Sequence, residues 1–262
     1  MTTQLLIYQS AVPITAARHA GVSVEPSDSY AFSAGVNAVP LMAVEFARAS
    51  PEYAIVFAAE SEELMPVVVL GIRNEQNLYL SADAHWKADY IPAFIRRYPF
   101  VFSASDDGKS LMLCIDESHP GVNREGRGNA LFGADAKSTP YVDKVLEFVK
   151  EFQRQLERTR LFGRRLKELG LLEPMQANVT TPGGEKLTLG GFLVASRDKL
   201  RALGGDELQQ LARTDELELL YLHLASMRNF NQVKDRLVGL PAVAAADGPV
   251  RPAKGRAKRS AK

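Results

Sequence analysis

The fold of this chain is decided largely by one segment, Thr139-Pro-Tyr-Val-Asp-Lys-Val-Leu-Glu-Phe-Val-Lys-Glu-Phe-Gln-Arg-Gln-Leu156. Thr139 can cap a helix, and Pro140 fits the first turn because the amide that proline lacks would have no partner there. We predict a helix from Thr139 to Gly170, about 45 Å long at 1.5 Å per residue. A bend near Thr159 or Gly163 would let it follow a compact body. Its buried stripe has the helical period of three and four and consists of Val142, Val145, Val149, Phe152 and Leu156.

Short apolar runs around this helix predict β-strands. Phe100-Val-Phe102 and Leu111-Met-Leu-Cys-Ile115 flank the turn-forming pair Asp107-Gly108, which predicts an antiparallel hairpin. A second hairpin is expected over residues 179–189 around Pro182-Gly-Gly184, with a further strand at 192–195. Three more sheet strands are rich in β-branched and aromatic residues and read Tyr53-Ala-Ile-Val-Phe57, Pro66-Val-Val-Val-Leu-Gly-Ile72 and Asn77-Leu-Tyr-Leu80.

The remaining segments complete an α+β fold: a mixed, mainly antiparallel sheet in the N-terminal half, the long helix, and a helical C-terminal part. Residues 1–37 are interpreted as edge strands and loops, and residues 39–48 as a short helix with Pro40 in its first turn. Residues 116–139 are interpreted as a glycine-rich loop anchored by Leu131 and Phe132, and residues 198–212 and 215–230 as helices. We predict one domain over residues 1–240 and a disordered basic tail over 241–262.

Composition and charge exclude several classes of protein. The 262 residues are 46% hydrophobic and 24% charged, which is typical of a globular chain. The net charge is +1, but the six basic residues after position 250 leave residues 1–250 with a net charge of −5. A nucleic-acid-binding domain is not expected on an acidic body, and the tail alone would contact nucleic acid weakly and in a salt-sensitive way.

The sequence also predicts a location. No apolar stretch approaches the length of about 18 residues that a bilayer span requires, and the first residues lack the pattern of a signal peptide. Cys114 is the single cysteine and lies in an apolar run, where a buried, reduced thiol is expected. We therefore expect no membrane span and a cytoplasmic location.

One block is distinctive: Trp86-Lys-Ala-Asp-Tyr-Ile-Pro-Ala-Phe-Ile-Arg-Arg-Tyr-Pro-Phe100. With Ser50-Pro-Glu-Tyr-Ala-Ile-Val-Phe57, Cys114-Ile-Asp-Glu117 and Tyr221-Leu-His-Leu-Ala-Ser226, it resembles the bacterial SapC family, named for S-layer-associated proteins, over residues 30–235. The resemblance implies an association with surface-layer or envelope proteins and brings no established reaction, cofactor or catalytic residue. A peptide-transporter permease of the same name is excluded by the absence of an apolar span.

The same block contains the candidate binding residues. Arginine offers planar, bidentate hydrogen bonds to a carboxylate, and Trp and Tyr supply rigid contact area. If the block is helical, Tyr90, Phe94 and Arg97 share one face, where a carboxylate or a peptide would bind. In the alternative interpretation, the apolar residues are core and the arginines pair with acids of the body. The candidates are Trp86, Tyr90, Arg96, Arg97 and Tyr98.

A second constellation, Asp116, Glu117 and His119, follows the strand that ends near Ile115. Two carboxylates and an imidazole at a strand end suit general acid–base chemistry, while the alternative is a turn with solvated acids. We predict no metal site, because an oxygenase triad needs two histidines and a carboxylate, and the next histidine, His223, lies in an apolar helical pattern. No nucleotide-binding loop or serine nucleophile motif is present, so no cofactor is expected.

Two functions follow from these observations. The first is an accessory protein without a membrane span that binds a protein or peptide partner, such as a surface-layer or envelope protein, through the block at residues 86–100. The alternative is an enzyme of unknown reaction that uses Asp116, Glu117, His119 and Arg96 or Arg97 in a pocket closed by the loop at 121–133. The lack of a catalytic motif favours the first.

Overall fold

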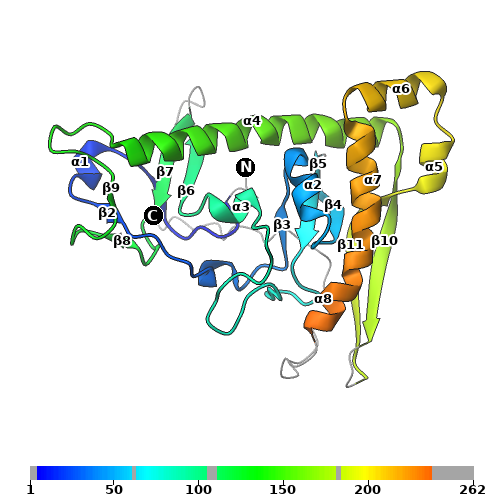
Figure 1. Ribbon diagram of the computed structural model, residues 1–262, viewed down its shortest axis with the longest axis horizontal. Helices are drawn as coiled ribbons and strands as arrows, with labels where there is room; N and C mark the ends of the chain where they lie inside the picture. The colour runs from blue at the N-terminus through cyan, green and yellow to red at the C-terminus, as the bar shows by residue number, and fades with distance from the viewer. Residues whose placement is uncertain (1–4, 61–62, 105–110, 181–183, 238–262) are drawn as a thin grey trace, which may run out of the picture.

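One helix, α4 (Pro140–Glu168), runs along most of the long axis of the molecule and packs against two separate sheets (Figure 1). The computed structural model describes residues 5–60, 63–104, 111–180 and 184–237. The sheets have the strand orders β1-β7-β6, β10-β11-β4-β5-β3 and β8-β2-β9, and all their pairs are antiparallel. The α+β class predicted from the sequence is confirmed.

The elements are short except for α4 and two strands. The strands are β1 (Ala11–Pro13), β2 (Ser23–Val24), β3 (Ala38–Pro40), β4 (Ile55–Glu60), β5 (Glu63–Val69), β6 (Phe100–Ala104), β7 (Leu111–Asp116), β8 (Val122–Asn123), β9 (Asn129–Ala130), β10 (Leu172–Thr180) and β11 (Lys186–Ala195). The other helices are α1 (Ala16–His19), α2 (Phe46–Ala49), α3 (Ala93–Arg96), α5 (Arg197–Arg201), α6 (Gly205–Arg213), α7 (Glu216–Ser226) and α8 (Phe230–Arg236), with 3₁₀ turns at Ala31–Ser33, Ala43–Glu45 and Met227–Asn229.

Strand β4 of the five-stranded sheet is buried on both faces. Along β4, Ile55 and Phe57 pack into the cluster under α4, whereas Val56 and Ala58 pack into a second cluster on the other face. Successive side chains of a strand point to opposite faces, so a strand covered on both sides is a continuous apolar run. This is why residues 53–57 carry no polar alternation.

Helix α4 begins as predicted but does not bend. Thr139 accepts a hydrogen bond from the Val142 amide, and Pro140 occupies the first turn. The helix is continuous to Glu168 and shows no sharp kink in Figure 1, because the molecule is elongated and the helix has no compact body to follow. Thr159 and Gly163, where a bend was expected, are contact points instead. Thr159 Oγ1 accepts a hydrogen bond from the Ala43 amide at 2.9 Å, and a Cβ on Gly163 would lie 2.2 Å from the Leu64 carbonyl oxygen.

The hairpin of β6 and β7 is confirmed, while the expected strand at residues 77–80 is wrong. Leu78 and Tyr79 are buried in two different clusters, which explains their apolar character, and only Leu80 forms an isolated bridge, with Trp86.

The helix predicted over residues 39–48 is also corrected. Pro40 ends the edge strand β3, where a missing amide costs no ladder hydrogen bond, and two short helical turns follow.

The C-terminal hairpin is longer than expected. β10 begins at Leu172, and β11 runs without interruption to Ala195, so the strand predicted at 192–195 is the end of β11. Gly191 has φ +81° close to a register shift between Met175 and Ala177, and this bulge resembles a strand break in the sequence. The helix predicted over residues 198–212 is divided into α5 and α6 by Gly204, which caps α6.

The N-terminal segment and the glycine-rich loop form a small sheet. β2 lies between β8 and β9, so the loop at residues 116–139 contains two short strands, and Leu131 is fully buried as the expected anchor. The apolar residues 5–8 and 30–36 form no strand, and β1 and β2 lie outside both runs. The predicted tail at 241–262 and the turns at Asp107-Gly108 and Pro182-Gly183 fall outside the described residues.

A side chain completes the five-stranded sheet. β4 and β11 pair at Phe57 and Leu193, and the next pair in this antiparallel register would be Ile55 and Ala195. His223 of α7 bridges that pair: its Nδ1 lies 2.8 Å from the Ile55 carbonyl oxygen, and its Nε2 accepts a hydrogen bond from the Ala195 amide at 2.9 Å. The imidazole therefore replaces a backbone hydrogen bond where the strands separate.

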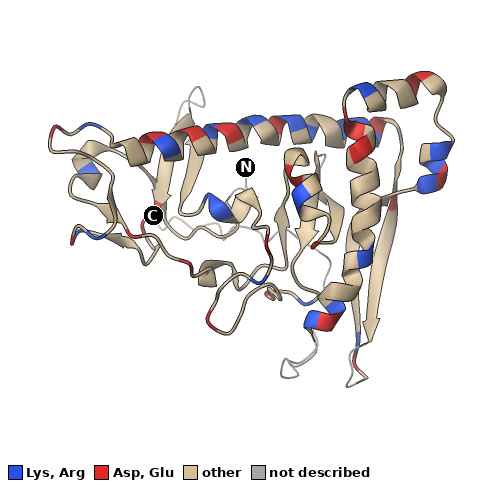
Figure 2. Ribbon diagram, in the orientation of Figure 1, with Lys and Arg blue, Asp and Glu red and all other residues tan. Residues whose placement is uncertain are grey.

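None of the helices in the described ranges combines the length and the apolar character that crossing a bilayer requires. Helix α4 is long, but Figure 2 shows acidic and basic residues along it. Several of these form ion pairs one turn apart, such as Glu147 with Lys150 and Glu157 with Arg160.

Candidate functional site

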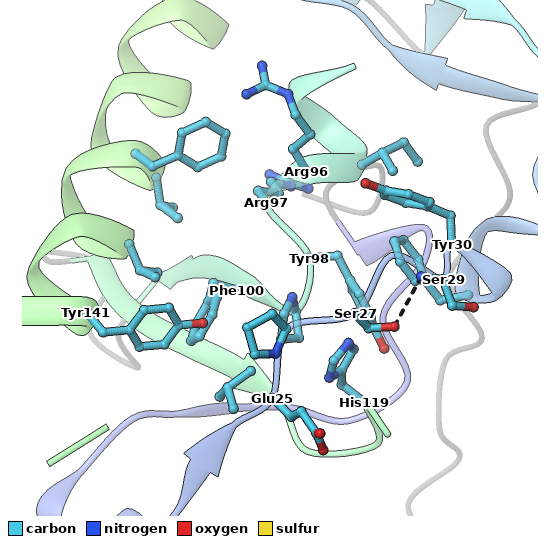
Figure 3. A pocket seen from close by; sticks show the side chains of 18 of the residues that line it. Glu25, Ser27, Ser29, Tyr30, Arg96, Arg97, Tyr98, Phe100, His119 and Tyr141 are labelled. Carbon is cyan, nitrogen blue, oxygen red and sulfur yellow. Dashed lines mark hydrogen bonds between the residues drawn. The ribbon is translucent and has the colours of Figure 1, made fainter. Parts of the chain in front are cut away.

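A pocket of about 470 Å³ lies between α3, the N-terminal half of α4 and residues 24–32 (Figure 3). Its walls combine aromatic rings, three cationic side chains and a few small polar groups. The lining residues are Val24, Glu25, Pro26, Ser27, Ser29, Tyr30, Phe32, Ile95, Arg96, Arg97, Tyr98, Pro99, Phe100, His119, Tyr141, Lys144, Val145, Phe148 and Val149. A concave, largely apolar site with a few convergent polar groups is typical of a ligand-binding pocket.

Helix α4 supplies one wall. Tyr141, Lys144, Val145, Phe148 and Val149 line the pocket, and their spacing of three and four residues places them on one helix face. Burial raises the pKa of Tyr141, which keeps its phenol neutral and available as a hydrogen-bond donor.

Arg96 lies at the opposite end of the pocket from Glu25 and His119 (Figure 3). Its side chain is exposed, its Nε donates to the Ile91 carbonyl oxygen at 2.9 Å, and its guanidinium lies 5.4 Å from the centre of the Phe148 ring. Arg96 also lines a second cavity of about 580 Å³, whose walls include Glu45 and Tyr90. Arg96 and Phe148 therefore stand between the two cavities.

Arg97 is buried with 2% exposure and forms part of the pocket floor. Its guanidinium lies 4.4 Å from the Phe94 ring centre and 4.5 Å from that of Phe152, and it hydrogen-bonds Tyr8. Desolvation lowers the pKa of Arg97, which Tyr8 partly offsets. This cation is held among aromatic faces, an arrangement that stabilises a buried guanidinium.

Tyr98 forms the centre of the pocket. Its ring stacks on Phe32 with 4.0 Å between ring centres and contacts His119 edge to face at 5.3 Å. Burial, with the nearby Asp116 carboxylate, raises the pKa of Tyr98 to about 12. The phenol is therefore neutral near neutral pH, and its ring offers a flat apolar surface with a polar edge.

The other two predicted binding residues lie outside this pocket. Trp86 is partly buried, donates from Nε1 to the Tyr53 hydroxyl at 2.7 Å, and contacts the Tyr30 ring at 5.7 Å. Tyr90 donates to the buried Glu45 carboxylate at 2.6 Å in the second cavity. The common helix face expected for Tyr90, Phe94 and Arg97 does not form, because Tyr90 precedes the four-residue helix α3.

The structure separates the predicted acid–base residues. Asp116 is fully buried and accepts hydrogen bonds from the amides of Gln9, Ser10 and Ser118 at 2.7, 3.0 and 3.0 Å. Glu117 pairs with Arg18 on the surface, at 2.5 Å. Asp116 is the last residue of β7 and is buried, whereas Glu117 begins the turn that follows the strand. Asp116 thereby fixes the N-terminal segment against β7.

His119 is the one member of that constellation that lines the pocket. Its Nδ1 accepts a hydrogen bond from the Gly121 amide at 3.0 Å. Burial lowers the pKa of His119, so its imidazole is neutral near neutral pH.

The pocket is positively charged on an acidic body. Arg96, Arg97 and Lys144 line it, against one carboxylate, that of Glu25. Glu25 accepts a hydrogen bond from Arg127 Nε at 2.9 Å, which offsets part of its charge, since Arg127 also pairs with Glu125. The site therefore favours an anionic group beside apolar surface. Within the described residues, no group of three histidine, cysteine or acidic side chains is arranged to hold a metal ion.

Sequence reasoning missed the α4 wall and the segment at residues 24–32. Lys144 lies beside the apolar stripe of α4, three residues after Tyr141 and four residues before Phe148. A lysine between two aromatic residues on one helix face was the available signal. Ser27, Ser29 and Tyr30 carry no such pattern, because long-range packing brings them to the pocket.

The fold and this site together define an α+β protein with an aromatic, positively charged pocket beneath a long helix. The chain belongs to the SapC family: the family model described as SapC matches residues 14–233. The match covers most of the chain and extends N-terminally beyond the resemblance noted from the sequence. No curated protein and no solved structure matches the chain.

Proposed function

We propose that the protein is an accessory protein that holds a segment of a protein or peptide partner in the pocket between α3 and α4. The observation that carries this proposal is the pocket itself, where Tyr98, Tyr141 and Phe148 offer rigid contact area and three cations outnumber the one carboxylate, that of Glu25. Tyrosine and arginine are enriched where proteins bind partner chains.

The proposed partner is a surface-layer or envelope protein, as the family name implies. The proposed place of action is the cytoplasm, where the free, buried thiol of Cys114 stays reduced. The arrangement of Asp116 and Glu117 gives the enzyme hypothesis no shared acid–base site, so binding is the function that the geometry supports best.

Blocking the pocket tests this function. Ser29 lies exposed on its rim, and Ser29→Phe places a ring at the entrance without touching the core. Leu161→Phe is the matched control, since Leu161 is exposed on α4 outside the pocket. Each variant is expressed in its own host and purified gently, and native mass spectrometry measures bound chains and their stoichiometry.

We expect the original chain and Leu161→Phe to retain a stoichiometric partner and Ser29→Phe to lose it, with similar melting temperatures for all three. Equal retention by Ser29→Phe would rule out the pocket as the binding site. A bound small molecule in place of a protein would overturn the accessory function.

A further inference from the structure

We propose that the pocket recognises a carboxylate attached to a large apolar group, with the carboxylate held between Arg96 and Lys144 and the apolar group packed on Tyr98 and Tyr141. This inference rests on the proposed function and names the part of the partner that the pocket reads. It assigns the anion to a pair of cations from two different elements, α3 and α4.

Arg96 and Lys144 are the cations available to an anion. Both side chains are exposed, and neither forms an ion pair with a carboxylate of the described residues. Arg97, in contrast, is buried among the rings of Phe94 and Phe152 and serves the floor of the pocket.

Glu45 is an acid close enough to feel the Arg96 charge. Burial raises the pKa of Glu45, and the Arg96 charge partly offsets this rise. Glu45 is buried and already accepts hydrogen bonds from the amides of Met42 and Ala93 at 2.8 and 2.7 Å, and from the Tyr90 hydroxyl. The hydrogen-bonding capacity of Glu45 is therefore largely used within the second cavity. Arg96 Nη2 makes a long contact of 3.5 Å with the Tyr90 hydroxyl, and the other terminal N–H groups of the guanidinium keep donors for a ligand.

The position of Arg96 is fixed before any ligand binds. Its Nε is held by the Ile91 carbonyl oxygen, and its guanidinium lies over the Phe148 ring. Lys144 lies one helical turn before Phe148 on the same face of α4. A planar guanidinium held in this way loses little conformational entropy when it forms a two-pronged bond with a carboxylate.

The apolar part of the ligand is defined by the rings. Phe32 stacks on Tyr98, and Phe100 contacts Tyr141 edge to face at 6.0 Å, so two aromatic pairs line the pocket. A phenylalanine-sized group fits beside them in a cavity of about 470 Å³. In a partner chain, the carboxylate is either the C-terminus or an acidic side chain next to an apolar residue.

Three short peptides separate these sources. The first is an N-acetylated tripeptide that ends in phenylalanine with a free carboxylate, the second is its C-terminal amide, and the third is an amidated peptide with an aspartate before the phenylalanine. Trp86, the single tryptophan, contacts the Tyr30 ring on the pocket wall and reports binding by its fluorescence. Titration calorimetry gives an independent affinity.

We expect the amide peptide to bind at least about tenfold more weakly than the tighter-binding of the two carboxylate peptides, because a charge-assisted, bidentate contact is lost. The substitutions Arg96→Gln and Lys144→Gln should each lower the affinity for that carboxylate peptide by about tenfold. Two charge-matched controls on α4, Arg164→Gln and Lys150→Gln, leave the affinity unchanged, since neither residue lines this pocket. Tight binding of the free acid identifies a C-terminus, and tight binding of the aspartate peptide identifies an internal acid.

Two results would overturn the carboxylate site. One is that the acid peptides and the amide bind with equal affinity. The other is that Arg96→Gln and Lys144→Gln bind the acid peptide as tightly as the unchanged chain does. Loss of partner capture by Ser29→Phe would then still support the proposed function. If Ser29→Phe captures its partner normally while the acid peptides bind as expected, the proposed function fails and the carboxylate pocket remains. The two proposals are therefore tested separately.

Discussion

The imidazole bridge between β4 and β11 makes the stability of this protein sensitive to acid. Burial lowers the pKa of His223 from 6.5 to about 4, despite the opposing hydrogen bond of Ile55. The neutral ring donates to Ile55 and accepts from Ala195, and protonation would turn the accepting Nε2 into a donor that faces another donor. A neutral His223 is therefore required in the folded protein.

The size of the effect follows from proton linkage. In the unfolded chain His223 takes up a proton near pH 6.5, whereas in the folded protein it does so only near pH 4. Its contribution is complete above the unfolded pKa and is lost as the pH falls between these two values, because the unfolded state then binds more protons. A difference of about 2.5 units corresponds to about 3 kcal/mol.

His223→Gln isolates this contribution. A glutamine amide can donate to Ile55 and accept from Ala195 but does not titrate in this range. At neutral pH we expect the variant to lose about 1 kcal/mol from imperfect replacement of two hydrogen bonds. Towards pH 4 the unchanged chain loses about 3 kcal/mol more than the variant, so the order of stability reverses.

Urea unfolding across this pH range, followed by circular dichroism, measures the free energy of unfolding of both proteins. His85→Gln, which removes an exposed histidine, is the control and should follow the unchanged chain. His119, whose pKa is also lowered by burial, is present in all three proteins and cancels from the comparison. A constant difference between His223→Gln and the unchanged chain from neutral pH to pH 4 would refute the reasoning.

Two further predictions concern stability. Gly163→Ala should reduce the free energy of unfolding by about 2 to 3 kcal/mol, because the new Cβ lies 2.2 Å from the Leu64 carbonyl oxygen and forces α4 away from β5. Gly205→Ala, with open space around the added carbon, should leave stability unchanged or raise it, and a similar loss in both variants would contradict this. Asp116→Asn should reduce stability by about 2 to 3 kcal/mol through weakened hydrogen bonds to Gln9 and Ser10, whereas Glu117→Gln on the surface should change it by less than about 1 kcal/mol. Urea unfolding decides both, and an unaffected Asp116→Asn would remove Asp116 from its structural role.

The sequence predicts the elements whose signals are local. Thr139 with Pro140 marks the start of α4, and the apolar runs flanking residues 105–110 predict the hairpin of β6 and β7. Where an apolar pair is buried without strand pairing, as at Leu78 and Tyr79, the same signal misleads, because composition reports burial and not hydrogen bonding.

The candidate site is predicted only in part, because it is assembled from segments distant in sequence. Arg96, Arg97 and Tyr98 are neighbours in the chain, and all three line the pocket. Arg96 is exposed and Tyr98 is partly buried, whereas Arg97 is buried in the floor of the pocket. Lys144 reaches the pocket from α4, and Ser29 reaches it from the N-terminal segment. No local pattern encodes their proximity, which depends on how α4 crosses the first sheet.

Helix α4 belongs to two cores at once: Val142 and Val149 pack with the β2, β6 and β7 side, and Phe152 and Leu166 pack with the five-stranded sheet. A cut before α4 would expose apolar surface in both parts, so we expect the described residues to melt as one cooperative unit. Because the pocket lies against the first turns of α4, a bound ligand then raises the melting temperature of the whole unit. At a ligand concentration of about one hundred times Kd, linkage adds about 2.7 kcal/mol, a rise of roughly 5 to 10 °C in Tm. Thermal-shift screening of peptide collections is thus a direct route to the partner segment.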